Sequence, residues 1–410
     1  MMRARDGYVC ASLCTGIVLA GCGLRQPFDG VSPDGVNSLA RPITLSRVEG
    51  QSHVRPAYGV IYSFKGFPSD GSSPFANLAN VNGTLYGTTF YGGTSDNGTV
   101  FAMTTSGESV LYNFEGGSDG TAPYAGLVNT GRTLYGTTSG GGSFSSGTVF
   151  AVAGGKESLL HSFTGGSGDG STPTAPLLAV DGTLYGTTKS GGANDQGTVF
   201  AISSSGKESV LHSFGGNSTD GAIPLAGLID FKGTFYGTTQ NGGTYNKGTV
   251  FKISPSGTES VMYSFKGGSA DGEYPYAGLL DVAGTLYGTT QNGGASNDGT
   301  VFKILSSGTE RVLYSFAGKA GKYPLAGLID IKGTLYGTTG YGGTHDDGTV
   351  FAFSSGKETV LHSFAGTPQD GANPLGSLLD VNGTLYGTTA FGGTASCPGE
   401  GCGTVFSLAP

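Results

Sequence analysis

The side chains best suited to chemistry in this chain lie at the variable positions of a motif that recurs seven times, and in the loops beside them. The motif reads Tyr-Gly-Thr-Thr, two variable residues, Gly-Gly, a short loop and Gly-Thr-Val-Phe. The variable residues include aromatic rings and amides, which stack on sugars or peptides and hydrogen-bond to them. Our candidate ligand contacts are therefore these residues and two in the adjoining loops: Phe90, Tyr91, Gln240, Asn241, Tyr245, Gln291, Asn292, Tyr341, His345 and Phe391. Ordinary loop variation and packing between repeats would explain the same pattern, and that interpretation stays open.

Acidic residues recur in the same loops. Asp followed by Gly is typical of a turn, because the carboxylate binds its own backbone and Gly adopts positive φ. Since an active site should be asymmetric, we interpret the six equivalent Asp-Gly pairs as scaffold. The aspartates of these pairs are Asp70, Asp119, Asp169, Asp220, Asp271 and Asp370, and further loop aspartates are Asp96, Asp195, Asp298, Asp346 and Asp347.

Signals for catalysis are weak. His161, His212 and His362 occupy one position where other units have Tyr, so we interpret them as packing residues and not as bases or ligands. His345 lies beside two aspartates, which alone does not make a metal site. No nucleophile elbow, phosphate-binding loop or zinc motif occurs, so the sequence predicts no catalytic residue, metal or cofactor. Whether a divalent cation such as Ca²⁺ binds the Asp-rich loops stays open.

Composition narrows the class of protein. The chain has 410 residues, 78 of them Gly, no Trp, and a net charge of −8. Glycine recurs at fixed places between short apolar runs, which indicates turns between strands. No basic stripe occurs, so we expect no nucleic-acid partner.

The elements that position these loops are short β-strands. The motif tyrosines are spaced by 49 to 51 residues, and each unit holds four β-rich runs. Asn-Gly and Asp-Gly turns, such as Asn82-Gly83, predict antiparallel hairpins. We therefore predict an all-β, seven-bladed β-propeller of four-stranded antiparallel blades, with essentially no helix and with residues 58–410 in the ring. We expect it to be a monomer.

The ends of the repeats predict how the ring closes. The repeats begin with a lone fourth strand, Gly59–Phe64, and end with a third strand, Gly403–Leu408. The N-terminal strand should complete the last blade and remove an exposed edge. An open solenoid of the same hairpins is the alternative.

The first 22 residues read as an export signal. Arg3 and Arg5 precede a short apolar run that ends in Leu19-Ala20-Gly21-Cys22. This resembles a bacterial lipoprotein signal, which implies acylation of Cys22, anchoring in the lipid bilayer and a place on the outer membrane or cell surface. An ordinary secretory signal is the alternative. Residues 23–57, rich in Pro, Gly and Ser, are interpreted as a flexible tether.

Two cysteines remain after export and anchoring. Cys397 and Cys402 lie in an insertion that only the last unit carries. In an oxidising compartment such a pair predicts a disulfide, whereas two free thiols or a soft-metal pair are the alternatives.

The whole repeat resembles the Gloeobacter/Verrucomicrobium (GloVer) tandem repeat, whose units read Gly-Thr-Leu-Tyr-Gly-Thr-Thr, Gly-Gly, Gly-Thr-Val-Phe and Leu-Tyr-Ser-Phe. The resemblance spans residues 58 to 408 and implies an exported bacterial protein with a choice of surface anchors. The strand layout is also similar to that of kelch repeats, without their Trp. Residues 94–101 and 344–351 resemble the Asp-box hairpin of sialidase-type propellers, which is structural.

These observations favour a lipid-anchored binding or interaction module, with a glycan or an envelope protein as ligand and no enzymatic activity. One alternative is a glycan-active hydrolase or lyase with carboxylates in the central funnel. The other is a purely structural envelope protein.

Overall fold

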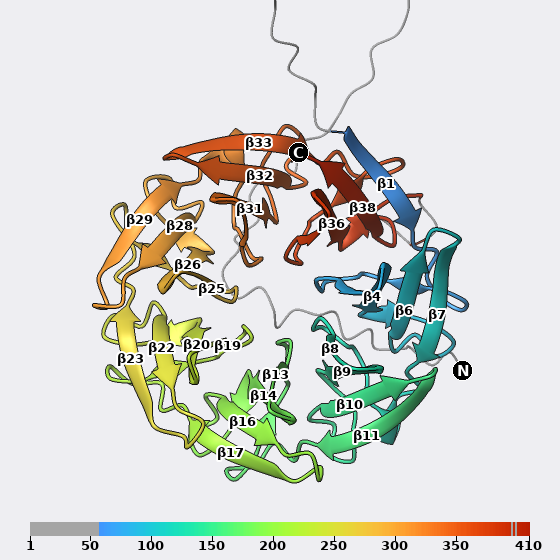
Figure 1. Cartoon of the computed structure of the whole chain (residues 1–410), viewed down its shortest axis with the longest axis horizontal. Helices are drawn as coiled ribbons and strands as arrows, with labels where there is room; N and C mark the ends of the chain where they lie inside the picture. The colour runs from blue at the N-terminus through green and yellow to red at the C-terminus, as the bar shows by residue number, and fades with distance from the viewer. Residues whose placement is uncertain (1–56, 395–396, 398–399) are drawn as a thin grey trace, which may run out of the picture. The chain divides into compact units, whose positions relative to one another are not determined.

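The computed structural model describes residues 57–394, Cys397 and 400–410, and these form a closed ring of seven blades (Figure 1). Each blade is a four-stranded antiparallel sheet with its shortest strand nearest the axis and its fourth strand at the rim. The only helical segments in the described residues are two 3₁₀ turns, η1 (Gly117–Asp119) and η2 (Gly318–Ala320), and neither could cross a bilayer. The predicted fold class is confirmed.

We number the blades one to seven along the chain. From the axis outward, their strands are β3 (Ala79–Val81), β4 (Thr84–Thr89), β6 (Thr99–Thr104) and β7 (Gly107–Asn113); β8 (Val128–Thr130), β9 (Thr133–Thr138), β10 (Thr148–Ala153) and β11 (Lys156–Ser162); β13 (Leu178–Val180), β14 (Thr183–Thr188), β16 (Thr198–Ile202) and β17 (Glu208–Ser213); β19 (Ile229–Phe231), β20 (Thr234–Thr239), β22 (Thr249–Ile253) and β23 (Glu259–Ser264); β25 (Leu280–Val282), β26 (Thr285–Thr290), β28 (Thr300–Ile304) and β29 (Glu310–Ser315); β30 (Ile329–Ile331), β31 (Thr334–Thr339), β32 (Thr349–Ser354) and β33 (Lys357–Ser363); and β35 (Leu379–Val381), β36 (Thr384–Thr389), β38 (Thr404–Ala409) and β1 (Ala57–Ser63).

The first hairpins of blades 1, 3 and 7 turn at the Asn-Gly or Asp-Gly pairs that the sequence predicts. In blade 1, Asn82 and Gly83 both have positive φ, 53° and 86°, which is the conformation of a tight two-residue hairpin. The backbone N–H of Gly83 also donates to Oδ1 of Asn80 at 2.9 Å. Asn-Gly and Asp-Gly pairs adopt this conformation at little cost, so the turn sets the register of the two innermost strands.

The N-terminal strand β1 closes the ring by pairing antiparallel with β38 of blade 7. Tyr58 lies opposite Leu408, Val60 opposite Phe406 and Tyr62 opposite Val405, with a bulge between Val60 and Tyr62. The same bulge occurs between the third and fourth strands of the other six blades. The predicted closure is therefore confirmed, and it excludes the open solenoid.

The hydrophobic core lies between blades, not within them. Seven buried clusters occur, one at each blade interface. Between blades 4 and 5, Phe265 and Phe302 meet edge to face with ring centroids 5.1 Å apart. A Cβ on Gly288 would lie 2.5 Å from the Phe302 ring, so the Gly of Tyr-Gly-Thr-Thr leaves room for that ring. A single blade could not bury these side chains alone, because its neighbour supplies half of each cluster.

The first Thr of Tyr-Gly-Thr-Thr joins each blade to the next. Thr238 in blade 4 donates through Oγ1 to the carbonyl of Ala277, which precedes blade 5, at 3.0 Å. The equivalent bond closes the ring from Thr388 in blade 7 to the Ala76 carbonyl before blade 1, at 2.8 Å. These hydrogen bonds are buried, so each contributes about 1 kcal/mol and costs more when one partner is lost.

Candidate functional site: the long-loop face

Both kinds of long loop lie on one face of the ring. The loop that leads into each blade and the loop between its second and third strands pair there through two-residue strands or single bridges. We call this side the long-loop face and the opposite side, which carries the hairpins, the short-turn face. The short pairs are β2 (Gly71–Ser72) with β5 (Tyr91–Gly92), β12 (Gly170–Ser171) with β15 (Ser190–Gly191), β18 (Gly221–Ala222) with β21 (Asn241–Gly242), β24 (Gly272–Glu273) with β27 (Asn292–Gly293), and β34 (Gly371–Ala372) with β37 (Phe391–Gly392), and the bridges join Thr121 to Gly140 and Lys322 to Tyr341.

The Asp-Gly aspartates of this face are held by their own loops. Asp271 accepts three hydrogen bonds, from the Tyr263 hydroxyl at 2.8 Å and from the backbone N–H groups of Lys266 and Gly272 at 2.8 and 2.7 Å. The same pattern recurs at Asp70, Asp169, Asp220 and Asp370, and in part at Asp119. These contacts agree with the interpretation of the six aspartates as scaffold.

A second acidic position also shapes loops. Asp96 has a φ of 57°, and its Oδ1 accepts a hydrogen bond from Gly92 N–H at 2.8 Å. Asp and Asn tolerate this left-handed conformation better than most residues. Asp195, Asn246, Asn297 and Asp346 repeat the turn. Asp298 accepts from the Gly318 N–H at 3.0 Å, and Asp347 lies against Gly366.

The central channel is narrow, and its lining is mainly small and apolar. Its cavity of about 240 Å³ is lined by the small and apolar residues that precede each innermost strand, such as Ala76, Ala226 and Ala326. The hydroxyls of Tyr124, before blade 2, and Tyr276, before blade 5, meet across it at 2.9 Å. None of the described residues that line this cavity carries a carboxylate or an imidazole. The funnel of converging carboxylates, which the enzyme alternative requires, does not form here.

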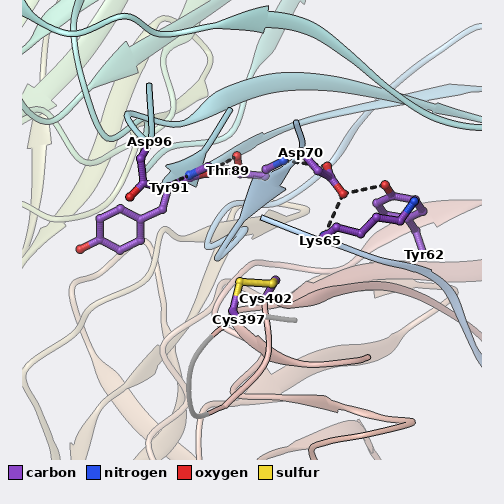
Figure 2. The surroundings of a disulfide bond; sticks show 10 residues. Tyr62, Lys65, Asp70, Thr89, Tyr91, Asp96, Cys397 and Cys402 are labelled. Carbon is purple, nitrogen blue, oxygen red and sulfur yellow. Dashed lines mark hydrogen bonds between the residues drawn. A yellow bond between two sulfur atoms is a disulfide. The ribbon is translucent and has the colours of Figure 1, made fainter. Parts of the chain in front are cut away.

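A larger cleft lies on the long-loop face where blade 7 meets blade 1. We call this boundary the closing interface and its cleft, of about 650 Å³, the closing cleft. Blade 7 contributes Phe391, Cys397, Glu400 and Gly401; the loop into blade 1 contributes Lys65, Phe67, Ser72 and Ser73; and blade 1 contributes Tyr91 and Asp96. Figure 2 shows Tyr91 and Asp96 on the blade 1 side and the disulfide on the blade 7 side.

The disulfide loop takes the place of the Asp or Asn turn of blades 1, 3, 4, 5 and 6. Cys397 and Cys402 are bonded, with Cα atoms 5.2 Å apart. Cys402 is buried within the core of the closing interface. Here Gly392 N–H donates to the backbone carbonyl of Glu400 at 2.6 Å, where blades 1 and 3 to 6 use an Asp or Asn side chain. The insertion therefore remodels one wall of the closing cleft and leaves the core below it intact.

Aromatic side chains connect the closing cleft with the mouth of the channel. Phe90 packs edge to face on Tyr91 and on Phe75, with ring centroids 4.6 and 5.2 Å apart. Phe75 in turn lies 5.1 Å from the ring of Tyr124, which belongs to the bridge across the channel. No comparable row of rings recurs among the described residues of the other six interfaces, so this region breaks the sevenfold repeat.

Three of the candidate contacts predicted from the sequence, Phe90, Tyr91 and Phe391, lie in or beside the closing cleft. The other seven belong to blades 4, 5 and 6 and do not line it. Tyr245 is 52% exposed, Tyr341 packs near Tyr323, and His345 contacts the Thr344 hydroxyl at 3.0 Å. Asn292 donates to a carbonyl of its own loop, and the remaining members are Gln240, Asn241 and Gln291.

Sequence reasoning missed a set of charged groups near the rim, which we call rim clusters. Each joins a Tyr or His of one outer strand, the Asp of the Asp-Gly turn, and a Glu from the next blade's outer strand. The clusters are Tyr62–Asp70–Glu108, Tyr112–Asp119–Glu157, His161–Asp169–Glu208, His212–Asp220–Glu259 and Tyr263–Asp271–Glu310. The Tyr or His lies seven or eight residues before the Asp, but the Glu comes from the next unit, and only the recurrence of all three positions in five units could have revealed the clusters.

The rim clusters shift the pKa values of their carboxyl groups in opposite directions. Burial raises the pKa of these five glutamates to about 7, and the neighbouring aspartate charge adds to the effect. Burial alone would also raise the pKa of Asp169 and Asp220. Hydrogen bonds from His and from backbone N–H groups outweigh it and hold both pKa values below the usual range.

Comparison with known proteins settles the family. The sequence profile of the Gloeobacter/Verrucomicrobia repeat matches residues 52–235 and 209–406, which is most of the chain. The chain belongs to this repeat family. No curated protein matches its sequence.

Several solved structures resemble this Gloeobacter/Verrucomicrobia repeat protein to different degrees. A streptogramin B lyase has a TM-score of 0.57 at 10% identity, covering 88% of this chain and 99% of its own. The computationally designed protein Ika8 has a TM-score of 0.48 at 15% identity, covering 86% and 100%. A gluconolactonase from Xanthomonas campestris has a TM-score of 0.41 at 15% identity, covering 68% and 82%. At 10% identity the likeness to the lyase is one of fold alone.

Proposed function

We propose that this chain is a lipid-anchored, exported binding module of a bacterial envelope, and that it recognises glycans in the closing cleft. One observation carries the proposal. The long-loop face is built from seven nearly identical units, and the closing cleft is where a unique disulfide loop and a row of aromatic rings interrupt them. Repeated residues build the ring, so the residues that differ are the best candidates for recognition.

The lining of the closing cleft suits a sugar. Phe67 is 59% exposed and Tyr91 is 40% exposed, so both offer apolar rings to solvent. Aromatic faces stack on the C–H groups of a pyranose, and nearby polar groups bind its hydroxyls. Lys65 offers a donor, Asp96 and Glu400 offer acceptors, and Ser72 and Ser73 offer hydroxyls. An open cleft between loops also admits an internal segment of a long polysaccharide.

The surroundings and positions of the carboxylates favour a binding role over catalysis. Asp96 is engaged in its own turn, and the channel lining that the structure describes holds no acid or base. Glycosidases use two carboxyl groups that flank the bond to be broken. The closing cleft contains Asp96 and Glu400, so turnover has to be tested directly. Release of reducing sugar from bound glycan, lost in Glu400→Gln, would replace this proposal with the enzyme alternative.

The anchor is the part of the proposal that rests on sequence alone. Cys22 and the tether of residues 23–57 lie outside the described residues, except for Ala57, where β1 begins. The Leu-Ala-Gly-Cys motif supports acylation of Cys22 after export. We expect the full chain to incorporate labelled fatty acid and to partition with membranes. Cys22→Ala should abolish both, and unchanged labelling would contradict the anchor.

Cosedimentation with insoluble cell-wall polysaccharide tests the binding role. The full chain should bind in a saturable manner, and the Phe67→Ala/Tyr91→Ala double variant should bind about 5- to 150-fold more weakly, since each ring contributes about 0.5–1.5 kcal/mol. Phe144→Ala and Tyr245→Ala remove rings that are 60% and 52% exposed on other blades and serve as matched controls. Equal losses in all three variants would contradict the assignment of the cleft. Loss of binding after protease treatment of the cell-wall material would identify a protein ligand instead.

A further inference from the structure

Two of the rim clusters contain imidazole where the others contain phenol. At the interface of blades 2 and 3, His161 Nε2 lies 3.3 Å from Asp169 Oδ2. At the interface of blades 3 and 4, His212 Nε2 lies 3.2 Å from Asp220 Oδ2. Glu208 and Glu259 complete these clusters, and in each cluster one nitrogen and two carboxylate oxygens lie within 4.8 Å of one another. We propose that these two clusters are divalent transition-metal sites, with Zn²⁺ as the probe cation.

The spacing of the donor atoms fits a single ion. Zn²⁺ binds His nitrogen and carboxylate oxygen at about 2.0–2.2 Å, so two ligands on a tetrahedron lie about 3.3 Å apart. The His–Asp distances of 3.3 and 3.2 Å match that edge. Each Glu supplies a third ligand, and solvent reaches the cluster because the side chains of His161 and His212 are 18% and 21% exposed. One imidazole, two carboxylates and water make a plausible set for Zn²⁺.

The ligands are oriented before any ion arrives. Asp169 accepts hydrogen bonds from the backbone N–H groups of Thr164 and Gly170, at 2.8 and 2.6 Å, which fix its carboxylate. The His161 ring packs edge to face on the buried Phe163, with centroids 4.7 Å apart, and His212 packs likewise on Phe214 at 4.8 Å. Outer contacts of this kind position metal ligands in known sites.

The glutamates provide a second, separate observation. Oε1 of Glu208 and Oε1 of Glu259 are buried and have no hydrogen-bond partner within the described residues. A buried acceptor without a partner is costly, and a cation would satisfy it. The same atom is unpartnered at Glu108, Glu157, Glu310 and Glu358. There the third group is a tyrosine, which donates a hydrogen bond and is a poor zinc ligand, so those clusters lack a nitrogen ligand.

The third histidine of this series, His362, lacks the glutamate that completes the other two clusters. His362 contacts Asp370 at 3.0 Å, but Tyr58 stands where the other clusters have Glu. Tyr58 stacks on the His362 ring with centroids 3.5 Å apart and donates its hydroxyl to Asp370. This cluster therefore has only two ligands, and Tyr58 occupies both of them. Of the three histidines at the equivalent position, only His161 and His212 belong to clusters with three ligands.

Zinc titration of the full chain by calorimetry, after treatment with a chelator, tests the number and place of the sites. His161→Tyr and His212→Tyr install the residue that other blades carry, so both variants should fold normally. Each should lose one equivalent of Zn²⁺ relative to the wild type, and the double variant should lose two. His362→Tyr is the matched control and should lose none. Because other histidines and cysteines stay in every variant, the differences between variants identify the sites.

A second pair of variants removes a carboxylate ligand while keeping the shape of the side chain. Glu208→Gln and Glu259→Gln should each weaken zinc binding at one site by at least tenfold while the thermal unfolding temperature measured with chelator is unchanged or higher. Unaltered stoichiometry in the His161→Tyr/His212→Tyr double variant, or no saturable uptake at micromolar zinc by the wild type, would overturn the proposal. Loss of an equivalent in His362→Tyr would contradict the two-site assignment.

Discussion

The closing interface and the interface of blades 4 and 5 are built alike below the surface. Phe64 meets Phe101 and Phe265 meets Phe302, both at 5.1 Å and with interplanar angles of 70° and 71°. The threonine bond to the next blade is 2.8 Å at the closing interface and 3.0 Å at the other. The junction that the first and last strands of the ring form thus has the same packing as one formed within a continuous segment of the chain.

The two interfaces differ on the long-loop face. At blades 4 and 5 the loop turns through Asn246, whose Oδ1 accepts from Gly242 N–H at 2.9 Å. At the closing interface a disulfide loop takes its place, and the closing cleft lies beside it. Packing is uniform around the ring, because every blade needs it, and we propose that recognition takes place where the loops depart from the repeat. Four predictions test this in order of expected size.

Removing one ring of the phenylalanine pair should have the largest effect. Phe101→Ala at the closing interface and Phe302→Ala at blades 4 and 5 should each lower the free energy of unfolding by about 3–5 kcal/mol, because each leaves a cavity in a buried cluster. Urea denaturation measures both. If the closing interface is packed as well as the others, the two losses agree to within about 1 kcal/mol, and a much smaller loss for Phe101→Ala would contradict the equivalence.

Removing the disulfide should distinguish the closing interface from the interface of blades 4 and 5. Cys397→Ala/Cys402→Ala opens a loop with a sequence separation of 5, so the chain-entropy model predicts a loss of about 2 kcal/mol in the free energy of unfolding. Treatment of the wild type with a reducing agent should reproduce the loss, whereas the double variant should not respond to it. Glycan binding should weaken as well, because the loop forms a wall of the closing cleft. Intact binding by the double variant would show that the loop is not needed for recognition.

The threonine bonds should contribute equally at both interfaces. Thr388→Val and Thr238→Val each keep the side-chain shape and leave a buried carbonyl without its donor. Each should lower the free energy of unfolding by about 1 kcal/mol, measured by urea denaturation. A loss confined to Thr388→Val would show that closure depends on this bond more than interior packing does.

The rim glutamates should make both interfaces weaken as pH rises. Burial raises the pKa of Glu108, at the closing interface, and of Glu310, at blades 4 and 5, from 4.5 to about 7. The folded state therefore holds a proton that the unfolded state loses, so this stability is complete below pH 4.5 and is lost as pH rises through 7. The unfolding temperature, measured with chelator between pH 5 and 8, should fall. Glu108→Gln and Glu310→Gln should each flatten the slope, and an unchanged slope would contradict the pKa shifts.

The fold was predictable because each strand boundary carries a local signal. Asn82-Gly83 marks a hairpin, and the lone strands at the two ends of the repeats predict that β1 pairs with β38. The disulfide was predictable because Cys397 and Cys402 are the only cysteines in the repeats. All of these inferences depend on residues near one another in sequence or on the repeat itself.

The site was less predictable because it depends on contacts between distant residues. Tyr124 and Tyr276 are 152 residues apart, and nothing in either segment indicates that their hydroxyls meet across the channel. The closing cleft combines Lys65 with Glu400, and the rim clusters combine side chains of neighbouring blades. The variable positions and the loops beside them named ten candidates, and only the three-dimensional arrangement separates Tyr91 and Phe391 from Gln240 and Tyr245.

Hydrogen–deuterium exchange with and without soluble cell-wall glycan fragments tests the central claim most directly, because it reads equivalent loops of every blade at once. Binding in the closing cleft predicts slower exchange of backbone amides in residues 65–73, 91–96 and 400–403. The equivalent loops at blades 4 and 5, residues 266–274 and 292–297, should be unchanged. Equal protection of both sets of loops, or protection confined to the mouth of the channel, would contradict the claim that recognition lies where the repeat is broken.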